Sequence, residues 1–397
     1  FDGHRFVGGA LDRGAVAILA EEPIADPRAR CVIVVPNSRA ALAQLAAAFY
    51  GNPSRELGLI GVTGTKGKTT TSFLIEAILA PQVQTGLIGT VDLKTGPRRW
   101  RNPAHQTTPE SLDVQRLLRE MVAHDVEWAV LETSSHALAT YRVDRCAYDI
   151  AVITNVTHEH LDFHGTYEAY REAKATLFDR IAPAGTKAAL PARFPRPRPA
   201  GGAWPRGAVI NLDDPGAASM LGRAREVPEV TYGLSGGAQV RAEGIVASGQ
   251  GLGFTLRSPW GAAVSAPLRG RFNVYNLLAA AATCLLVGLS PGQIAAALAG
   301  FGGVPGRVQR IDRGQPFLVV VDFAHNADSL RQVLELLRTV TTGRVIALFG
   351  SGGERDVAKR AMMGRICADG VSFGIFTDED PRGEDRLAII EGIASGA

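Results

Sequence analysis

Apolar and amphipathic segments alternate along most of the chain. Short apolar runs predict buried strands, and segments with apolar residues three and four positions apart predict helices. The predicted strands lie at 15–19, 31–35, 59–62, 85–89, 128–131, 149–154, 208–212, 317–322, 344–349 and 372–377. The predicted helices lie at 38–50, 70–79, 111–124, 167–178, 276–287, 290–298, 327–339, 358–368 and 386–393. This alternation predicts an α/β fold.

Turn clusters rich in glycine and proline interrupt this pattern twice. The clusters at 51–54 and 302–306 predict domain boundaries. Three regions result, at 1–55, 56–304 and 305–397. Residues 229–268 alternate polar and apolar side chains with many glycines, and this pattern predicts antiparallel strands. Residues 183–207 are rich in Pro, Arg, Gly and Ala, which predicts an exposed loop with little packed core.

The composition narrows the class of protein. The 397 residues are 46% apolar and 20% charged, which is ordinary for a globular protein. A net charge of +3 is too small to indicate a nucleic-acid or membrane partner, and no apolar run reaches 18 residues. The four cysteines lack C-x-x-C spacing, so we expect reduced thiols in a cytoplasmic protein. The chain starts at Phe1 and stops within a helical pattern, so we expect a fragment of a longer protein.

A phosphate-binding loop is predicted where the strand at 59–62 meets the helix at 70–79. The linking residues are Gly64, Thr65, Lys66, Gly67, Lys68, Thr69 and Thr70. Glycines let backbone N–H groups face a polyphosphate, and the helix offers its positive N-terminal end. Lys68 would bridge phosphates, and the Thr69 hydroxyl would hold Mg²⁺. The usual pattern G-x-x-x-x-G-K-[ST] requires glycine where Val62 stands, so this loop is a variant.

Polar residues also follow other predicted strands, at the edge where open α/β sheets bind ligands. Glu132 ends the strand at 128–131, and its carboxylate can hold Mg²⁺. The segment after the strand at 149–154 concentrates imidazole and carboxylate groups: His158, Glu159, His160, Asp162 and His164. Magnesium with one contributing histidine is the favoured interpretation, while a zinc site and a purely structural role stay open.

Three more candidates lie towards the end of the chain. Asp322 ends the strand at 317–322 and His325 follows it. Arg307 lies just beyond the second turn cluster, where a cation can reach a phosphate. Lys174, on the helix at 167–178, is by itself typical of a solvated surface lysine.

Taken together, these segments resemble the Mur ligases, most closely the MurE type. Matching residues lie in the phosphate loop and at 2–6, 107–110, 132–138, 154–165, 173–174, 270–276, 305–307, 321–325, 350–355 and 377–382. The resemblance implies a three-domain architecture, with a central P-loop parallel-sheet ATPase domain and a Rossmann-like C-terminal domain. The first domain would bind the UDP part of the substrate, the second ATP, and the third the incoming amino acid. It also implies a monomer with no nucleic-acid or membrane partner.

The resemblance assigns roles to particular residues. The catalytic group would be Lys68, Glu132, His160 and Lys174. Two Mg²⁺ ions would be held by Thr69, Glu132, His160 and a carbamylated Lys174. Besides the phosphate loop, the ATP contacts would be Asn276, Arg307, Asp322 and His325. The contacts with the UDP-muramoyl-peptide and the amino acid would be Thr107, Thr108, Ser134, Arg142, Asp380 and Arg382.

The implied reaction is ATP-dependent amide ligation in peptidoglycan precursor synthesis. Diaminopimelate would be joined to the D-Glu of UDP-MurNAc-L-Ala-D-Glu through an acyl phosphate. Members that add diaminopimelate carry Asp-Asn-Pro-Arg where this chain has Glu379-Asp380-Pro381-Arg382, so L-lysine or L-ornithine stays open as the acceptor. A folylpolyglutamate-synthetase-like ligase and a non-catalytic nucleotide-binding module also stay open.

Overall fold

The computed structural model describes residues 2–104, 106–187, 204–248, 251–257, 261–354 and 356–397. Two compact units form. One comprises Phe1–Ile245, Gly253–Ala266 and Phe272–Phe301, and the other comprises Val246–Leu252, Pro267–Arg271 and Gly302–Ala397. Within the described ranges, no helix has the length and apolar character needed to cross a membrane.

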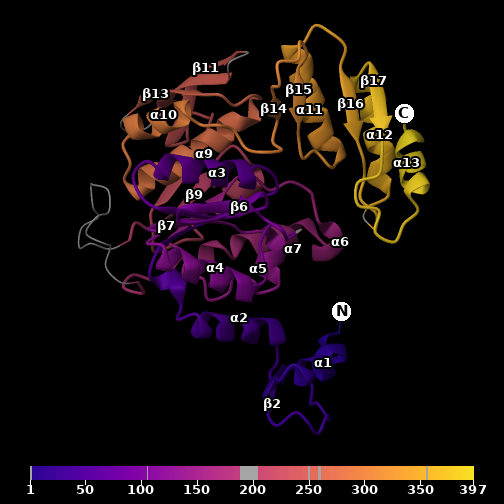
Figure 1. The fold of residues 1–397 in the computed structure, drawn as a ribbon. Helices are drawn as coiled ribbons and strands as arrows, with labels where there is room; N and C mark the ends of the chain where they lie inside the picture. Colours follow the sequence, from indigo (N-terminus) through magenta and orange to yellow (C-terminus); the bar gives the residue numbers. More distant parts are fainter. Residues whose placement is uncertain (1, 105, 188–203, 249–250, 258–260, 355) are drawn as a thin grey trace. The chain divides into compact units, whose positions relative to one another are not determined.

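A large sheet forms the centre of the first unit (Figure 1). In the described part of the chain, eleven strands pair in the order β13 (Ala262–Ala266), β12 (Gly251–Arg257), β11 (Val240–Ser248), β10 (Glu229–Gly233), β9 (Gly207–Asn211), β8 (Ile150–Ile153), β3 (Gly58–Thr63), β7 (Trp128–Glu132), β4 (Thr85–Ile88), β5 (Asp92–Thr95) and β6 (Arg98–Arg101). Every neighbouring pair from β10 to β4 is parallel. The carboxyl ends of β3, β4, β7 and β8 therefore meet at one edge of the sheet.

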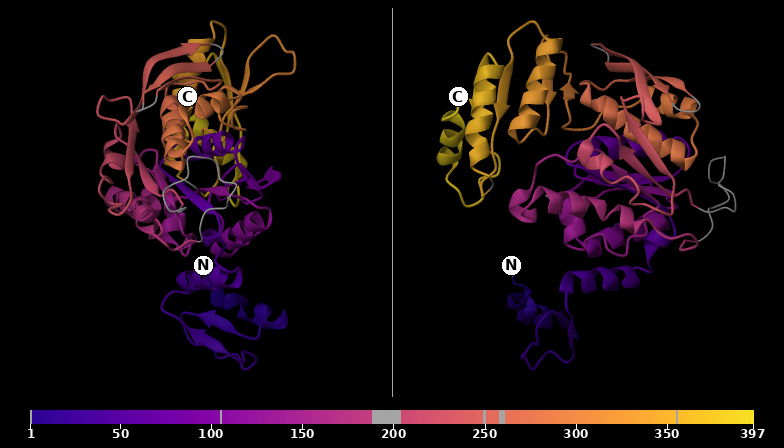
Figure 2. Two further views of the ribbon diagram at one scale, coloured as in Figure 1. Left: turned by 90° about the vertical axis from the view of Figure 1, so that its left-hand side faces the viewer. Right: turned by 180° about the vertical axis from the view of Figure 1, so that it is seen from behind.

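Helices cover both faces of this sheet, as Figures 1 and 2 show. One face carries α3 (Lys68–Leu79), α9 (Phe272–Val287) and α10 (Pro291–Ala299). The other carries α4 (Ser111–Ala123), α5 (Ser135–Ala139) and α7 (Tyr167–Ala175), whose apolar side chains join the main core. Because both faces are covered, β3, β7, β8 and β9 are buried along their whole length and their sequences are nearly continuous apolar runs.

Shorter elements complete the first unit. They are η1 (Gly3–Phe6), α1 (Val7–Asp12), β1 (Ile18–Ala20), β2 (Val32–Val34), α2 (Ser38–Phe49), η2 (Pro53–Arg55), α6 (Leu161–His164), η3 (Phe178–Arg180) and α8 (Pro215–Ala218). Strands β1 and β2 are parallel, as expected for an α/β segment.

The second unit is a smaller α/β unit. Its elements are β14 (Gln309–Ile311), β15 (Val319–Val321), α11 (Ala327–Val340), β16 (Ile346–Phe349), α12 (Ala358–Gly370), β17 (Phe373–Phe376) and α13 (Arg386–Ala394). Strands β14 and β15 are antiparallel, while β16 and β17 are parallel. Leu330, Leu334 and Met363 form the buried centre between α11 and α12.

Most predicted elements are confirmed to within a few residues, but one strand direction was predicted wrongly and one hairpin was missed. The predicted antiparallel start of 229–268 is wrong, because β10 pairs in parallel with both β9 and β11. Alternation of polar and apolar residues reports one exposed face and carries no information on strand direction. The hairpin of β5 and β6 was missed, since its residues are mostly polar and charged.

The predicted exposed loop at 183–207 is also corrected at its described ends, while 188–203 lies outside the described residues. The Lys187 side chain is 4% exposed and forms a buried ion pair with Asp149. The Trp204 ring packs edge-on against Trp128 at 5.3 Å. Burial raises the pKa of Asp149 to about 6 and lowers the pKa of Lys187, so the pair is held against a desolvation cost.

Replacing Lys187 with Met should lower the free energy of unfolding by about 3 kcal/mol, because Asp149 would stay buried without its partner. Urea unfolding followed by circular dichroism measures this loss. The double variant Asp149→Asn/Lys187→Met should recover most of it, since the neutral amide still accepts the Leu59 N–H bond. A single variant as stable as the parent protein would contradict the interpretation.

Candidate active site

The phosphate loop joins β3 to α3 at the carboxyl edge of the sheet. Val62, where the usual pattern has glycine, lies inside β3 and pairs with Glu132 of β7. The loop instead turns at Gly64 and Gly67, whose φ angles are +143° and +86°. A side chain at Gly64 would collide with Thr154, so glycine is required here for space as well as conformation.

Two lysines share one backbone acceptor in this loop. Lys68 Nζ donates to the carbonyls of Gly64 and Thr65 at 2.8 and 3.0 Å. Lys174 Nζ donates to the same Gly64 carbonyl at 2.9 Å. Lys174 is 1% exposed, so the expectation of a solvated side chain is wrong. Burial, with the charge of Lys68 added, lowers the pKa of Lys174 well below its usual value.

A buried carboxylate lies next to the start of α3. Glu132 is fully buried, and its Oε2 accepts a 2.9 Å hydrogen bond from the Thr69 hydroxyl. Thr90, which follows β4, donates its backbone N–H to Oε1 at 3.0 Å and lies within 2.9 Å of Oε2 through its hydroxyl. Burial raises the pKa of Glu132, while the Thr90 bonds and the charge of Lys68 act in the opposite direction. Thr90 was not among the residues predicted from the sequence, although its position directly after a strand was a usable signal.

Residues after β8 and on α7 hold the loop in shape. The Asn155 side chain bonds both the N–H and the carbonyl of Lys66, each at 2.9 Å. The Thr65 hydroxyl lies 2.9 Å from the Tyr170 hydroxyl. The Tyr170 ring also faces Lys174 Nζ at 4.3 Å. The loop conformation is therefore fixed by contacts from outside the loop itself.

The histidine-rich segment lies beside this loop. His160 has a left-handed backbone (φ +57°) and directly precedes α6. Its ring packs edge-on against His136 at 4.7 Å, and His136 also contacts His164 at 5.5 Å. Burial and the neighbouring His160 lower the pKa of His136 to about 4, and burial lowers the pKa of His160. His158 instead stacks on Tyr167. His136 was not among the predicted site residues.

The predicted substrate contacts line the next part of the same edge. The Thr90 and Thr107 hydroxyl oxygens are 3.1 Å apart. Thr108 donates to the Glu132 carbonyl at 2.7 Å and lies 3.3 Å from the Ser134 hydroxyl, which caps α5. Arg142 pairs with Glu110 at 3.1 Å. The predicted metal-binding residues and the predicted substrate contacts are therefore adjacent, and Thr90 and Glu132 connect them.

The remaining candidates divide between the two units. Asn276 lies on α9 of the first unit, 3.4 Å from the Thr71 hydroxyl, and occupies the space where a Gly67 side chain would stand. In the second unit, Asp322 accepts from the N–H groups of Val308 and Ala324 at 2.7 and 2.8 Å. The Arg307 guanidinium covers the Phe323 ring at 4.5 Å, and the His325 ring nitrogen Nδ1 lies 3.0 Å from the Phe323 carbonyl.

The predicted acceptor residues lie on a turn of the second unit. Arg382 has φ +51°, and its Nε lies 3.4 Å from the Asp380 carboxylate. The Asp380 carbonyl accepts the Gly353 N–H at 2.8 Å, which joins this turn to the glycine turn after β16. Both side chains are exposed, at 37% for Arg382 and 68% for Asp380.

The donor set fits magnesium and a nucleotide. Thr69 and Glu132 offer a hydroxyl and a carboxylate, the hard oxygen ligands that Mg²⁺ prefers, beside backbone N–H groups at a helix N-terminus. Across the described ranges, no group of three or more His, Cys, Asp or Glu side chains is arranged to hold a metal ion. The Thr69 hydroxyl and the Glu132 carboxylate favour magnesium, while the zinc interpretation of the histidine-rich segment stays open.

Comparison with known families agrees with this geometry. Residues 62–284 match the Mur ligase middle domain, and residues 306–397 match the Mur ligase glutamate ligase domain. The chain belongs to the Mur ligase family. The α/β fold and the resemblance drawn from the sequence are thereby confirmed. The three-domain division and the assignment of individual site residues stay predictions.

Within the family, the chain is most informatively compared with two curated relatives. It is 47% identical to UDP-N-acetylmuramyl-tripeptide synthetase of Roseiflexus sp. (strain RS-1), over 100% of this chain and 77% of the relative. It is 45% identical to UDP-N-acetylmuramoyl-L-alanyl-D-glutamate–2,6-diaminopimelate ligase of Geobacillus kaustophilus (strain HTA426), with the same coverage.

Solved structures give the same picture. A structure of UDP-N-acetylmuramoyl-L-alanyl-D-glutamate–2,6-diaminopimelate ligase is 33% identical, with a TM-score of 0.69 over 99% of this chain and 76% of that one. Folylpolyglutamate synthase of Mycobacterium tuberculosis, solved with ADP and AMPPCP, also has a TM-score of 0.69, over 90% of this chain and 84% of that one. At 18% identity, this second likeness concerns the fold alone.

Gly67→Ala should abolish measurable ATP binding, because a Cβ would collide with Asn276 and the positive φ angle disfavours a side chain. Isothermal titration calorimetry measures this. Gly222→Ala is the matched control, since Gly222 has φ +77° but open space around its Cβ position. Equal ATP affinity in both variants would show that the loop does not bind the nucleotide.

Proposed function

We propose that the protein is an ATP-dependent ligase that joins meso-2,6-diaminopimelate to the D-Glu residue of UDP-N-acetylmuramoyl-L-alanyl-D-glutamate. The observation that carries the proposal is the grouping of Lys68, Thr69 and Glu132 at the phosphate loop, in a chain 45% identical to a ligase named for this reaction. The reaction would take place in the cytoplasm, by a monomer.

In the first step the γ-carboxylate of D-Glu would attack the γ-phosphorus of ATP. A new P–O bond forms, the bond to the β-phosphate oxygen breaks, and ADP leaves. The product is an acyl phosphate, which has the leaving group that a free carboxylate lacks. Lys68 would exchange its contacts with the Gly64 and Thr65 carbonyls for phosphate oxygens and stabilise the negative charge there.

In the second step the amine of the amino acid would attack the acyl carbon. A C–N bond forms, the bond to the phosphate oxygen breaks, and the amine loses a proton. Thr107, Thr108, Ser134 and Arg142 would bind the UDP-muramoyl-peptide, a role supported by their shared edge of the sheet. Asn276, Arg307, Asp322 and His325 would bind the nucleotide.

Thr69, Glu132, His160 and a carbamylated Lys174 would hold two Mg²⁺ ions, which neutralise phosphate charge when bound. The low pKa of Lys174 supports the carbamate. Only a neutral amine attacks CO₂, forming an N–C bond and releasing a proton. The resulting anion would turn the buried Lys174 from a donor at the Gly64 carbonyl into an oxygen ligand.

Lys174→Ala should reduce turnover at least about 100-fold, because the variant cannot form the carbamate. ATP affinity should change little, and added short carboxylic acids should restore part of the turnover. A phosphate-release assay measures turnover, and calorimetry measures ATP affinity. Lys187→Ala is the control for loss of a buried lysine far from the loop, at the amino ends of the strands. Full turnover in the Lys174 variant would exclude the carbamate.

A panel of acceptors in the phosphate-release assay tests the proposed substrate. Diaminopimelate should support turnover, whereas lysine and ornithine should not, since Arg382 suits a distal carboxylate. Asp380→Asn should lower the KM for diaminopimelate about threefold, because Asp380 competes for the Arg382 guanidinium. Turnover with lysine alone would favour lysine as the acceptor. The extra carboxylate of Asp380 supports this alternative, because it attracts a purely cationic side chain.

A further inference from the structure

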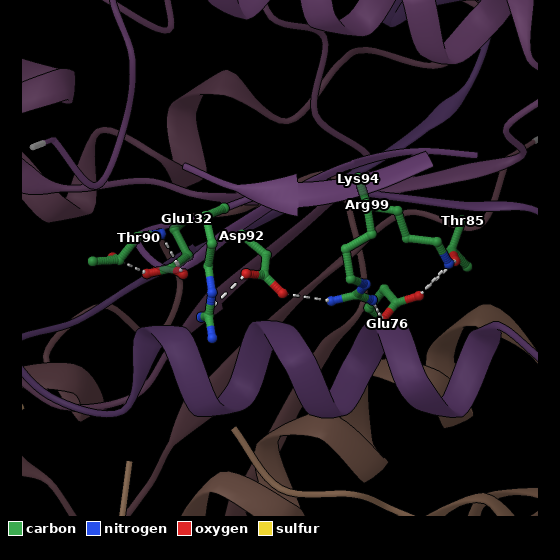
Figure 3. A network of polar contacts seen from close by, with 8 residues as sticks. Glu76, Thr85, Thr90, Asp92, Lys94, Arg99 and Glu132 are labelled. Carbon is green, nitrogen blue, oxygen red and sulfur yellow. Dashed lines mark hydrogen bonds and ion pairs between the residues drawn. The ribbon is translucent and has the colours of Figure 1, made fainter. Parts of the chain in front are cut away.

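Gly89 and Thr90 lie in the turn between β4 and β5. Figure 3 shows Thr90 beside the buried Glu132 carboxylate. The Thr90 backbone N–H donates to Glu132 Oε1 at 3.0 Å, and its hydroxyl lies 2.9 Å from Oε2. A Cβ at Gly89 would collide with Glu132 Oε1. Both residues therefore depend on the Glu132 side chain: Thr90 donates hydrogen bonds to it, and Gly89 leaves the space that it occupies.

The Thr90 hydroxyl has two neighbours and one proton. It lies 2.9 Å from Glu132 Oε2 and 3.1 Å from Thr107 Oγ1, so it donates to one of them at a time. Glu132 Oε2 also receives the Thr69 hydroxyl at 2.9 Å. Thr90 is thus the direct link between the carboxylate and the first of the two threonines proposed to contact substrate.

A charged network fixes the hairpin that follows this turn. Glu76, on α3, is 4% exposed and pairs with Lys94 of β5 at 2.6 Å and Arg99 of β6 at 2.5 Å. Arg99 also contacts Asp92, the first residue of β5, at 3.4 Å. Lys94 and Arg99 lower the pKa of Glu76 although burial acts to raise it. Figure 3 shows the network along α3, the helix that begins with Lys68 and Thr69.

These contacts connect α3, Glu132 of β7 and the β5–β6 hairpin to one another. The start of α3 donates to Glu132 through Thr69, while Glu76 further along the same helix anchors the hairpin that begins with the Thr90 turn. Glu132 is therefore bonded directly by Thr69 of α3 and by Thr90, and the hairpin that follows Thr90 is anchored to the same helix through Glu76. Because Glu132 has zero exposure, water cannot replace these donors, and without them the carboxylate would lose its fixed orientation.

We propose that Thr90 is a positioning residue for the ligase reaction, which orients the Glu132 carboxylate for Mg²⁺ and links it to Thr107. The inference rests on the proposed function of this site. The partners of metal ligands usually change metal affinity 10- to 100-fold when removed. Thr90→Val keeps the backbone N–H bond and the side-chain shape, and removes only the hydroxyl.

The first test measures ADP affinity by calorimetry, with and without Mg²⁺. Thr90→Val should reduce the gain in affinity that Mg²⁺ provides by about 10-fold and leave Mg²⁺-free affinity unchanged. Thr90→Ser should restore the gain. Thr95→Val is the matched control, since Thr95 is buried on β5 and donates to Glu120 at 3.0 Å, away from Glu132. Gly89→Ala should act in the same direction as Thr90→Val, by displacing the carboxylate.

The second test measures turnover against Mg²⁺ concentration. The concentration for half-maximal rate should rise about 10-fold in Thr90→Val and stay unchanged in Thr95→Val. The inference would be overturned if Thr90→Val behaved like the parent protein in both tests. It would also be overturned if the variant lost the same factor in ADP affinity with and without Mg²⁺. Failure of the parent protein to release phosphate with any acceptor would instead overturn the proposed function, while the calorimetric test of Thr90 would still apply.

Discussion

The buried Glu132 carboxylate is the constraint on which the site depends. It has no exposure to water, so its charge must be met by donors from the protein. Those donors come from the start of α3 through Thr69 and from the end of β4 through Thr90. The parallel order of β4, β7 and β3 makes this possible, because it brings three strand ends to one edge. A change in strand register would remove the carboxylate from its partners.

The variant phosphate loop follows from the same constraint. Val62 is paired with Glu132 across β3 and β7, and both are completely buried. A glycine at position 62 would leave a gap against this core and would loosen the strand that positions the loop. The turn is therefore made two residues later, at Gly64, where Thr154 fills the space beyond the backbone. In this member of the Mur ligase family, Val62 thus replaces the glycine of the usual motif at a completely buried position of β3.

Most of the fold was predictable from the sequence, whereas the roles of single site residues stay predictions. The apolar runs identified β3, β7, β8 and β9, and the loop glycines identified the start of α3. The burial of Lys174 was not predictable from the helix pattern, because a lysine on an amphipathic helix is ordinarily solvated, and only the family resemblance pointed to a role for it in the site. The β5–β6 hairpin was also missed, since its polar residues resemble a loop when the ion pairs of Glu76 are not known. Thr90 was missed although it directly follows a predicted strand, because its bonds to Glu132 join residues far apart in the sequence. The pattern of polar and apolar residues along the sequence does not show which distant residues a charged group pairs with.

The carbonyl of Gly64 accepts from two lysine side chains, Lys68 and Lys174, whose Nζ groups repel each other whenever both are protonated. An anion that draws Lys68 outward leaves the carbonyl to Lys174 and relieves that repulsion. Conversely, neutralising Lys174 makes Lys68 the sole cation at that carbonyl. The two lysines are therefore thermodynamically linked. If neutralising Lys174 changes the affinity for phosphate by some factor, phosphate binding changes the equilibrium for neutralising Lys174 by the same factor.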